Sequence, residues 1–83
     1  MTRRCVQVIV RDGCHLCVDA VAIAQRVCAD VGADFGTLDV DADPALAEHT
    51  DHVPVTLVDG RRLAIWFLDE HQLRDALTAA IGQ

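Results

Sequence analysis

Two cysteines separated by two residues are the most chemically informative feature of this chain. Cys14 and Cys17 enclose His15 and Leu16, where an apolar, strand-like run gives way to an amphipathic helix. The spacing places the thiols one helical turn apart, so they can close into a disulfide and open again. The unpaired N–H groups and dipole of a helix N-terminus favour a thiolate at Cys14, which is the attacking form in disulfide exchange. The position therefore predicts redox chemistry.

The two cysteines are expected to play different parts. Cys14 would attack a substrate disulfide, and Cys17, more buried and with a higher pKa, would then attack the sulfur of Cys14. His15 either carries partial positive charge that stabilises the thiolate or is an exposed side chain without a catalytic role. A pair of structural thiols or a fixed disulfide is the alternative to exchange chemistry.

The remaining cysteines and the histidines give no second motif of this kind. Cys5 and Cys28 are expected to be buried small hydrophobes. A zinc site would need a second paired ligand motif beside Cys14, and His49 and His52 do not provide one. We therefore expect no metal.

Composition limits the classes of protein to which the chain can belong. It has 83 residues, of which 52% are hydrophobic, and a net charge of -6. We expect one domain over residues 1–83, with neither nucleic acid nor an anionic membrane as its partner. Residues 5–10 follow two arginines but are too few for a signal peptide, so we interpret them as a strand. A reducing, cytoplasmic compartment is the expected location.

Hydrophobic periodicity and turn residues predict the element order β-α-β-α-β-β-α. The strands are expected at residues 5–10, 34–40, 55–58 and 62–67. The helices are expected at residues 14–31, at 43 to about 50, and from 69 onward. Because helices join the first three strands, we expect these to be mainly parallel, with the last two forming an antiparallel hairpin.

Individual residues mark the ends of these elements. Gly32 would end the first helix, Asp43-Pro44 would begin the second, and Asp69 would cap the last. Asp59-Gly60 is a two-residue hairpin signal. The buried stripe of the last helix is expected to comprise Leu73, Ala76, Leu77, Ala80 and Ile81.

The motifs in this order resemble a known family. Cys14-x-x-Cys17 opens the first helix, and Val53-Pro54 precedes the third strand. Together with the run from Asp39 to Leu46 and Asp59-Gly60, they are similar to small glutaredoxin-like bacterial proteins. The resemblance implies an α/β, thioredoxin-like fold with a four-stranded mixed sheet flanked by three helices.

The resemblance also implies a cis peptide bond before Pro54, beside the cysteine pair. The backbone of Val53 would then be available to pair with an extended substrate segment. From the sequence alone, an ordinary trans proline that starts a strand remains open.

Two positions bear on glutathione as a thiol co-substrate. Arg11 stands where glutaredoxins often carry a basic residue that holds a glutathione carboxylate, although a solvated loop arginine is the alternative. The family's Gly-Gly pair is replaced by Ala64-Ile65, followed by Trp66 and Phe67, whose side chains would obstruct a small tripeptide. We expect Trp66 to pack in the core, with a surface for a protein substrate as its alternative use.

These observations predict a thiol–disulfide oxidoreductase of the glutaredoxin-like type. It would pass two electrons between Cys14/Cys17 and the disulfide of a protein or small molecule, as a monomer without a resident cofactor. A reductase or a low-molecular-weight thiol would supply the electrons. The alternative is a non-enzymatic binding module whose cysteine pair is weakly active or structural.

Overall fold

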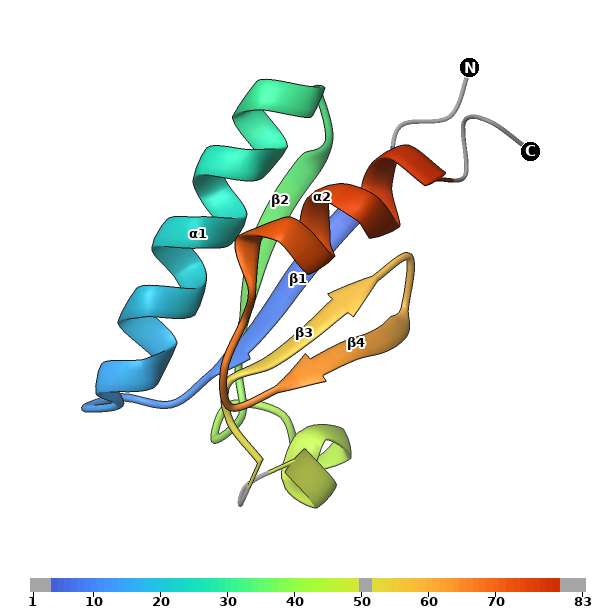
Figure 1. The fold of residues 1–83 in the computed structure, drawn as a ribbon. Helices are drawn as coiled ribbons and strands as arrows, with labels where there is room; N and C mark the ends of the chain where they lie inside the picture. Colours follow the sequence, from blue (N-terminus) through green and yellow to red (C-terminus); the bar gives the residue numbers. More distant parts are fainter. Residues whose placement is uncertain (1–3, 50–51, 80–83) are drawn as a thin grey trace.

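The computed structural model describes residues 4–49 and 52–79 of the chain. Its strands are β1 (Cys5–Val10), β2 (Asp34–Asp39), β3 (Val55–Val58) and β4 (Arg61–Ile65). Its helices are α1 (His15–Val31), the short 3-10 helix η1 (Pro44–His49) and α2 (Glu70–Ala79). The strands form one mixed sheet in the order β2-β1-β3-β4 (Figure 1). The predicted α/β class, with a four-stranded mixed sheet and three helices, is confirmed.

The direction of β3 differs from the prediction. β1 is parallel to β2 but antiparallel to β3, with Ile9 facing Val55 and Val6 facing Val58. The prediction of three mainly parallel strands is therefore wrong for β3. A parallel β3 would require the chain to cross back over a face of the sheet. Instead, η1 stays at the end of the sheet where β2 finishes and β3 begins (Figure 1).

Both long helices cover the same face of the sheet (Figure 1). Val6 and Val8 of β1 point to this face and pack with α1 residues such as Val27 and with Leu73 and Leu77 of α2. Burial of these apolar side chains is the main force that holds the two layers together. The opposite face has a smaller core, which packs against η1 and is made of Ile9, Val40 and Val55 with the partly buried Leu46.

The predicted stripe of α2 is confirmed where the structure describes it. Leu73 and Leu77 are buried, and Ala76 is half-buried. Ala80 and Ile81 lie outside the described residues, as does Thr50 at the predicted end of the second helix.

Most of the predicted element ends are confirmed. Gly32 ends α1 in the left-handed conformation at φ 79°, and its N–H donates to the carbonyl of Cys28 at 2.9 Å. The carboxylates of Asp43 and Asp69 accept backbone N–H groups of the helices that follow, at 2.9 and 2.8 Å. The second helix is a 3-10 helix of six residues, which is longer than most 3-10 runs.

The hairpin between β3 and β4 also fixes the start of β1. Asp59 and Gly60 both have positive φ, as a two-residue hairpin requires. One carboxylate oxygen of Asp59 accepts the N–H of Cys5 at 2.9 Å, and the other lies 2.6 Å from Nε of Arg4. The hairpin is thereby tied to the central strand.

An ion-pair network joins the two long helices. Arg74 of α2 contacts Asp30 of α1 at 2.6 Å and Glu70 at 3.1 Å, and Glu70 also pairs with Arg26 of α1. The arginines hold the pKa of the Glu70 carboxyl below its usual range, Arg26 having the larger effect. None of the helices in residues 4–49 and 52–79 is long and apolar enough to cross a membrane.

Candidate active site

The thiols of Cys14 and Cys17 meet at the N-terminus of α1. Both are free, Cys14 being partly exposed and Cys17 only 3% exposed. The sulfur of Cys14, the N-cap residue, accepts a hydrogen bond from the backbone N–H of Cys17 at 3.1 Å. A thiolate at Cys14 would therefore receive a backbone donor as well as the positive end of the helix dipole.

The turn before α1 places Cys14 in this position. β1 ends at Val10, and the N–H of Cys14 donates to the carbonyl of Arg11 at 3.3 Å. Gly13 has φ 77°, a conformation that is strained for residues with a side chain, although the space around it is open. The turn carries the chain directly from the central strand into the helix.

Cys17 lies on the inner side of this turn. Burial raises the pKa of its thiol to about 11, and contact with Cys14 adds to the increase. Cys17 therefore holds its proton at neutral pH, whereas Cys14 is partly exposed to solvent. The prediction that Cys17 is the more buried of the two cysteines is confirmed, and the direction of its pKa shift is the expected one.

Val53 and Pro54 lie at the same end of the sheet as the cysteines. The peptide bond between them is cis, as the resemblance implies. Pro54 is buried and Val53 is partly buried. Val55 pairs with Ile9, so the start of β3 runs beside the end of β1, from which the turn to Cys14 departs.

Arg11 and His15 flank Cys14 along the chain. His15 is the first residue of α1 and is exposed. The guanidinium of Arg11 contacts the carboxylate of Asp41 at 3.3 and 3.4 Å. Sequence reasoning missed this pair because its members lie 30 positions apart and share no motif. The structure thus brings Arg11, Cys14, His15 and Cys17 together at one strand–helix junction.

Trp66 is not in the core, so the expectation of core packing is wrong. The side chain is 47% exposed, and that of the next residue, Phe67, is 72% exposed. β4 ends at Ile65, and Trp66 adopts a left-handed backbone at φ 64° just beyond the strand. Its ring lies 6.3 Å from that of His52, centre to centre.

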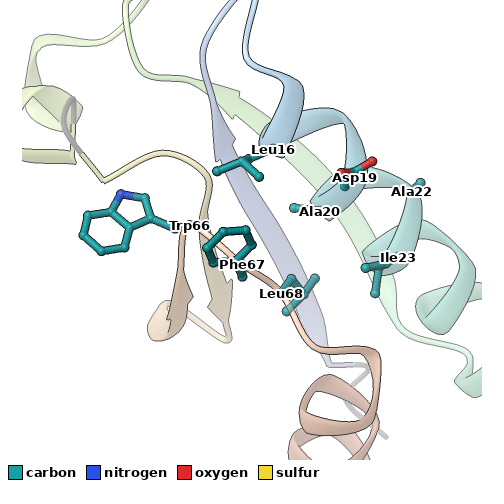
Figure 2. A pocket seen from close by; sticks show the side chains of 8 residues that line it. All are labelled: Leu16, Asp19, Ala20, Ala22, Ile23, Trp66, Phe67 and Leu68. Carbon is teal, nitrogen blue, oxygen red and sulfur yellow. The ribbon is translucent and has the colours of Figure 1, made fainter.

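A groove of about 380 Å³ lies between α1 and residues 66–68. Leu16 and Ile23 of α1 line one side, and Phe67 and Leu68 line the other (Figure 2). Leu16 lies between His15 and Cys17, so the groove begins beside the cysteine pair. One signal in the sequence could have indicated this groove, namely the two adjacent aromatic residues after the last strand.

The other two cysteines lie away from this junction. Cys28 is buried on the core side of α1, and burial raises the pKa of its thiol. Cys5 is only partly buried, so the expectation that it is a buried hydrophobe is wrong, because it lies at the very start of β1. Across residues 4–49 and 52–79, no three His, Cys, Asp or Glu side chains gather as metal ligands would.

Sequence comparison identifies a matching family. The family model described as "Glutaredoxin-like domain (DUF836)" matches residues 5–78. An uncharacterised protein of Mycobacterium tuberculosis is 39% identical over 80 residues, which cover 89% of this chain and 82% of that protein.

Solved structures agree with the fold described above. A structural-genomics target protein from X. campestris is 34% identical with a TM-score of 0.71, over 89% of this chain and 96% of that chain. A variant thioredoxin from Halobacterium salinarum is 23% identical with a TM-score of 0.69, over 94% of this chain and 74% of that chain. The fold is therefore thioredoxin-like.

Proposed function

This chain belongs to the glutaredoxin-like domain family (DUF836), and from that premise we propose that it is a thiol–disulfide oxidoreductase acting through Cys14 and Cys17. One observation carries the proposal. The sulfur of the partly exposed Cys14 accepts a backbone N–H at 3.1 Å, while the buried thiol of Cys17 lies one helical turn away. This asymmetry suits an attacking thiolate followed by a resolving thiol.

The reaction has two exchange steps. The Cys14 thiolate attacks one sulfur of a substrate disulfide, forming a mixed disulfide while the other substrate sulfur leaves as a thiolate. Cys17 then loses its proton to solvent and attacks the sulfur of Cys14. The Cys14–Cys17 disulfide forms and the second substrate sulfur leaves as a thiolate. The substrate gains two electrons and the protein loses two.

A thiol donor must return the protein to its dithiol form. We assign this step to a low-molecular-weight thiol or to a dithiol reductase, which becomes oxidised as the Cys14–Cys17 bond is reduced. The protein itself would act as a monomer and without a resident cofactor.

Four neighbours complete the proposed site. His15, exposed beside Cys14, would add positive charge near the thiolate. Val53 and Pro54 would offer backbone to an extended substrate segment, as an added strand does. Arg11 would contact a substrate carboxylate with a guanidinium that already pairs with Asp41. Arg11 is therefore the neighbour with the least support as a substrate contact.

A binding module without turnover is the second candidate function. The observation in its favour is the exposed pair Trp66 and Phe67, which directly follows Ala64-Ile65, the pair that stands where glutaredoxins carry Gly-Gly. Such a module would keep the groove but would not need a reactive Cys14.

A single-turnover experiment separates the two functions. The prereduced protein is mixed with hydroxyethyl disulfide without other reductant, and oxidation is followed by mass spectrometry of acid-quenched samples. The wild type should lose two hydrogens and release two equivalents of thiol. Cys14→Ser should react on the order of 100-fold more slowly, because only poorly reactive thiols remain. Cys5→Ser, which removes a partly exposed thiol elsewhere, serves as the control. Equal rates for the wild type and Cys14→Ser would rule out this mechanism and favour the binding module.

A further inference from the structure

The groove beside the cysteine pair has walls that are apolar and open to solvent. Leu16 and Ile23 face Phe67 and Leu68 across it (Figure 2). Phe67 remains 72% exposed, so most of its surface is in contact with water. An apolar group that entered the groove would remove part of this surface from water, which is a favourable change.

The groove is continuous with the segment that precedes β3. The N–H of Trp66 donates to the carbonyl of Pro54 at 2.8 Å, and the ring of Trp66 lies beside that of His52. Trp66 also lines the groove. A chain that lay along Val53 would therefore reach the groove without leaving the protein surface, whereas a small disulfide would occupy only part of this length.

The charges around the groove also favour a polypeptide chain over a small disulfide such as that of glutathione. Asp19 places a carboxylate among the lining residues, and the chain as a whole carries a net charge of -6. On the other side of the cysteines, the guanidinium of Arg11 is already paired with Asp41. Glutathione has more carboxylates than ammonium groups, so this surface repels it, whereas a basic side chain would be attracted.

We propose that the groove between α1 and residues 66–68 selects cystine-bearing polypeptides that present an apolar side chain beside a basic one, in preference to glutathione disulfide. Phe67 contacts the apolar side chain and Asp19 attracts the basic one. The inference rests on the proposed function, because it names the substrates of the same cysteine pair. The chemistry is the two-step exchange described above, with the polypeptide disulfide as electron acceptor.

The test compares matched disulfides in the single-turnover experiment. The probes are disulfide-linked dimers of the tripeptides Leu-Cys-Arg, Leu-Cys-Glu and Ser-Cys-Arg, together with glutathione disulfide and hydroxyethyl disulfide. Each rate constant is divided by that of mercaptoethanol with the same disulfide. This ratio removes differences in the intrinsic reactivity of the disulfides, which depends on the leaving thiol.

The wild type and two groove variants should differ in their rates with these disulfides. The wild type should prefer the Leu-Cys-Arg dimer over glutathione disulfide by about tenfold, as partial burial of one apolar side chain would give. Phe67→Ala should slow the reaction with the Leu-Cys-Arg dimer more than the reaction with the Ser-Cys-Arg dimer, so that the advantage of Leu-Cys-Arg is lost. Asp19→Asn should reduce the preference for Leu-Cys-Arg over Leu-Cys-Glu. Val31→Ser, which alters an exposed apolar side chain at the far end of α1, should change none of these ratios.

Other results would overturn the proposal. Glutathione disulfide reacting as fast as the Leu-Cys-Arg dimer, or Phe67→Ala slowing every disulfide equally, would exclude the assigned substrate class while leaving the oxidoreductase function intact. Failure of every probe, hydroxyethyl disulfide included, to oxidise the wild-type cysteine pair would instead refute the oxidoreductase function itself.

Discussion

The backbone N–H of Cys17 donates to the sulfur of Cys14, 3.1 Å away. The two residues that would form a disulfide are therefore already in contact when both are reduced. The N–H that stabilises an anionic sulfur belongs to the residue that would later displace the substrate from it. Attack and resolution are thus linked through one turn of helix.

Substitution of the resolving cysteine should trap the intermediate. Cys17→Ser keeps the Cys14 sulfur and its backbone donor but removes the thiol that completes the exchange. We expect a stable mixed disulfide with a model substrate, one per chain, measured as a mass increase that dithiothreitol reverses. The Cys14→Ser/Cys17→Ser double variant is the control. A single Cys17→Ser variant that gains no mass would show that Cys14 is not the attacking residue.

Stability should fall between about pH 9 and pH 11. The pKa of the Cys17 thiol rises from 9.0 to about 11 on folding, so the unfolded chain releases this proton at lower pH than the folded chain. The part of the free energy of unfolding that is linked to this proton is fully present below pH 9. It is lost as pH rises through 11, by on the order of 2 kcal/mol. The chain has no tyrosine, and all seven of its basic residues are arginine, so cysteines are the side chains that titrate in this window.

Urea unfolding followed by circular dichroism, with a reductant present, measures this dependence. Cys17→Ser should have a shallower decline from pH 9 to pH 11 than the wild type. Part of the decline should remain, because burial also raises the pKa of Cys28. Identical slopes for the two proteins would contradict the assignment to Cys17.

The ion pairs that Glu70 forms between α1 and α2 should stabilise the protein only above the pKa of Glu70. Hydrogen bonds from Arg26 and Arg74 lower that pKa below its ordinary value of 4.5. The contribution is therefore present above about pH 4.5 and is lost as pH falls through the lower, folded-state pKa. Glu70→Gln should have a lower urea midpoint than the wild type at pH 7, and the gap should close towards pH 3.

The control for this prediction is Glu48→Gln, which removes the same charge from the exposed η1 helix. Its effect at pH 7 should be smaller than that of Glu70→Gln. High salt should also narrow the gap for Glu70→Gln, because exposed ion pairs are screened. If the difference in urea midpoint between the wild type and Glu70→Gln persisted at pH 3, Glu70 would stabilise the protein through packing and not through its charge.

Two glycines should respond oppositely to the same substitution. Gly32 and Gly36 both have open space where a Cβ would lie, but Gly32 has φ 79° whereas Gly36 lies within β2. Gly32→Ala should destabilise the protein by about 1 kcal/mol, since left-handed backbone is costly for alanine. Gly36→Ala should be neutral or stabilising by up to about 1 kcal/mol. Thermal unfolding measures both, and equal losses would mean that conformation is not the cause.

The sequence was sufficient for features that depend on neighbouring residues. The end of α1 at Gly32 and the hairpin at Asp59-Gly60 each require a backbone conformation that the local residue types favour. The asymmetry between Cys14 and Cys17 also followed from local periodicity, because Cys17 falls on the buried face of α1.

Features that depend on distant segments were not predictable in the same way. The direction of β3 depends on whether η1 crosses the sheet, and the residues 44–49 are helical in either case. Trp66 has a large apolar side chain of the kind usually found in a core. The left-handed backbone just after β4 nevertheless places it at the surface. The pairing of Arg11 with Asp41 depends on two loops that meet only after the sheet has formed.

The position of Trp66 has a practical consequence. It is the chain's one tryptophan, and it lines the groove. Its backbone N–H is hydrogen-bonded to the carbonyl of Pro54. At 47% exposure its indole is in contact with both solvent and protein. Intrinsic fluorescence should therefore report occupancy of the groove directly, so that binding can be titrated optically in a protein that carries no added label.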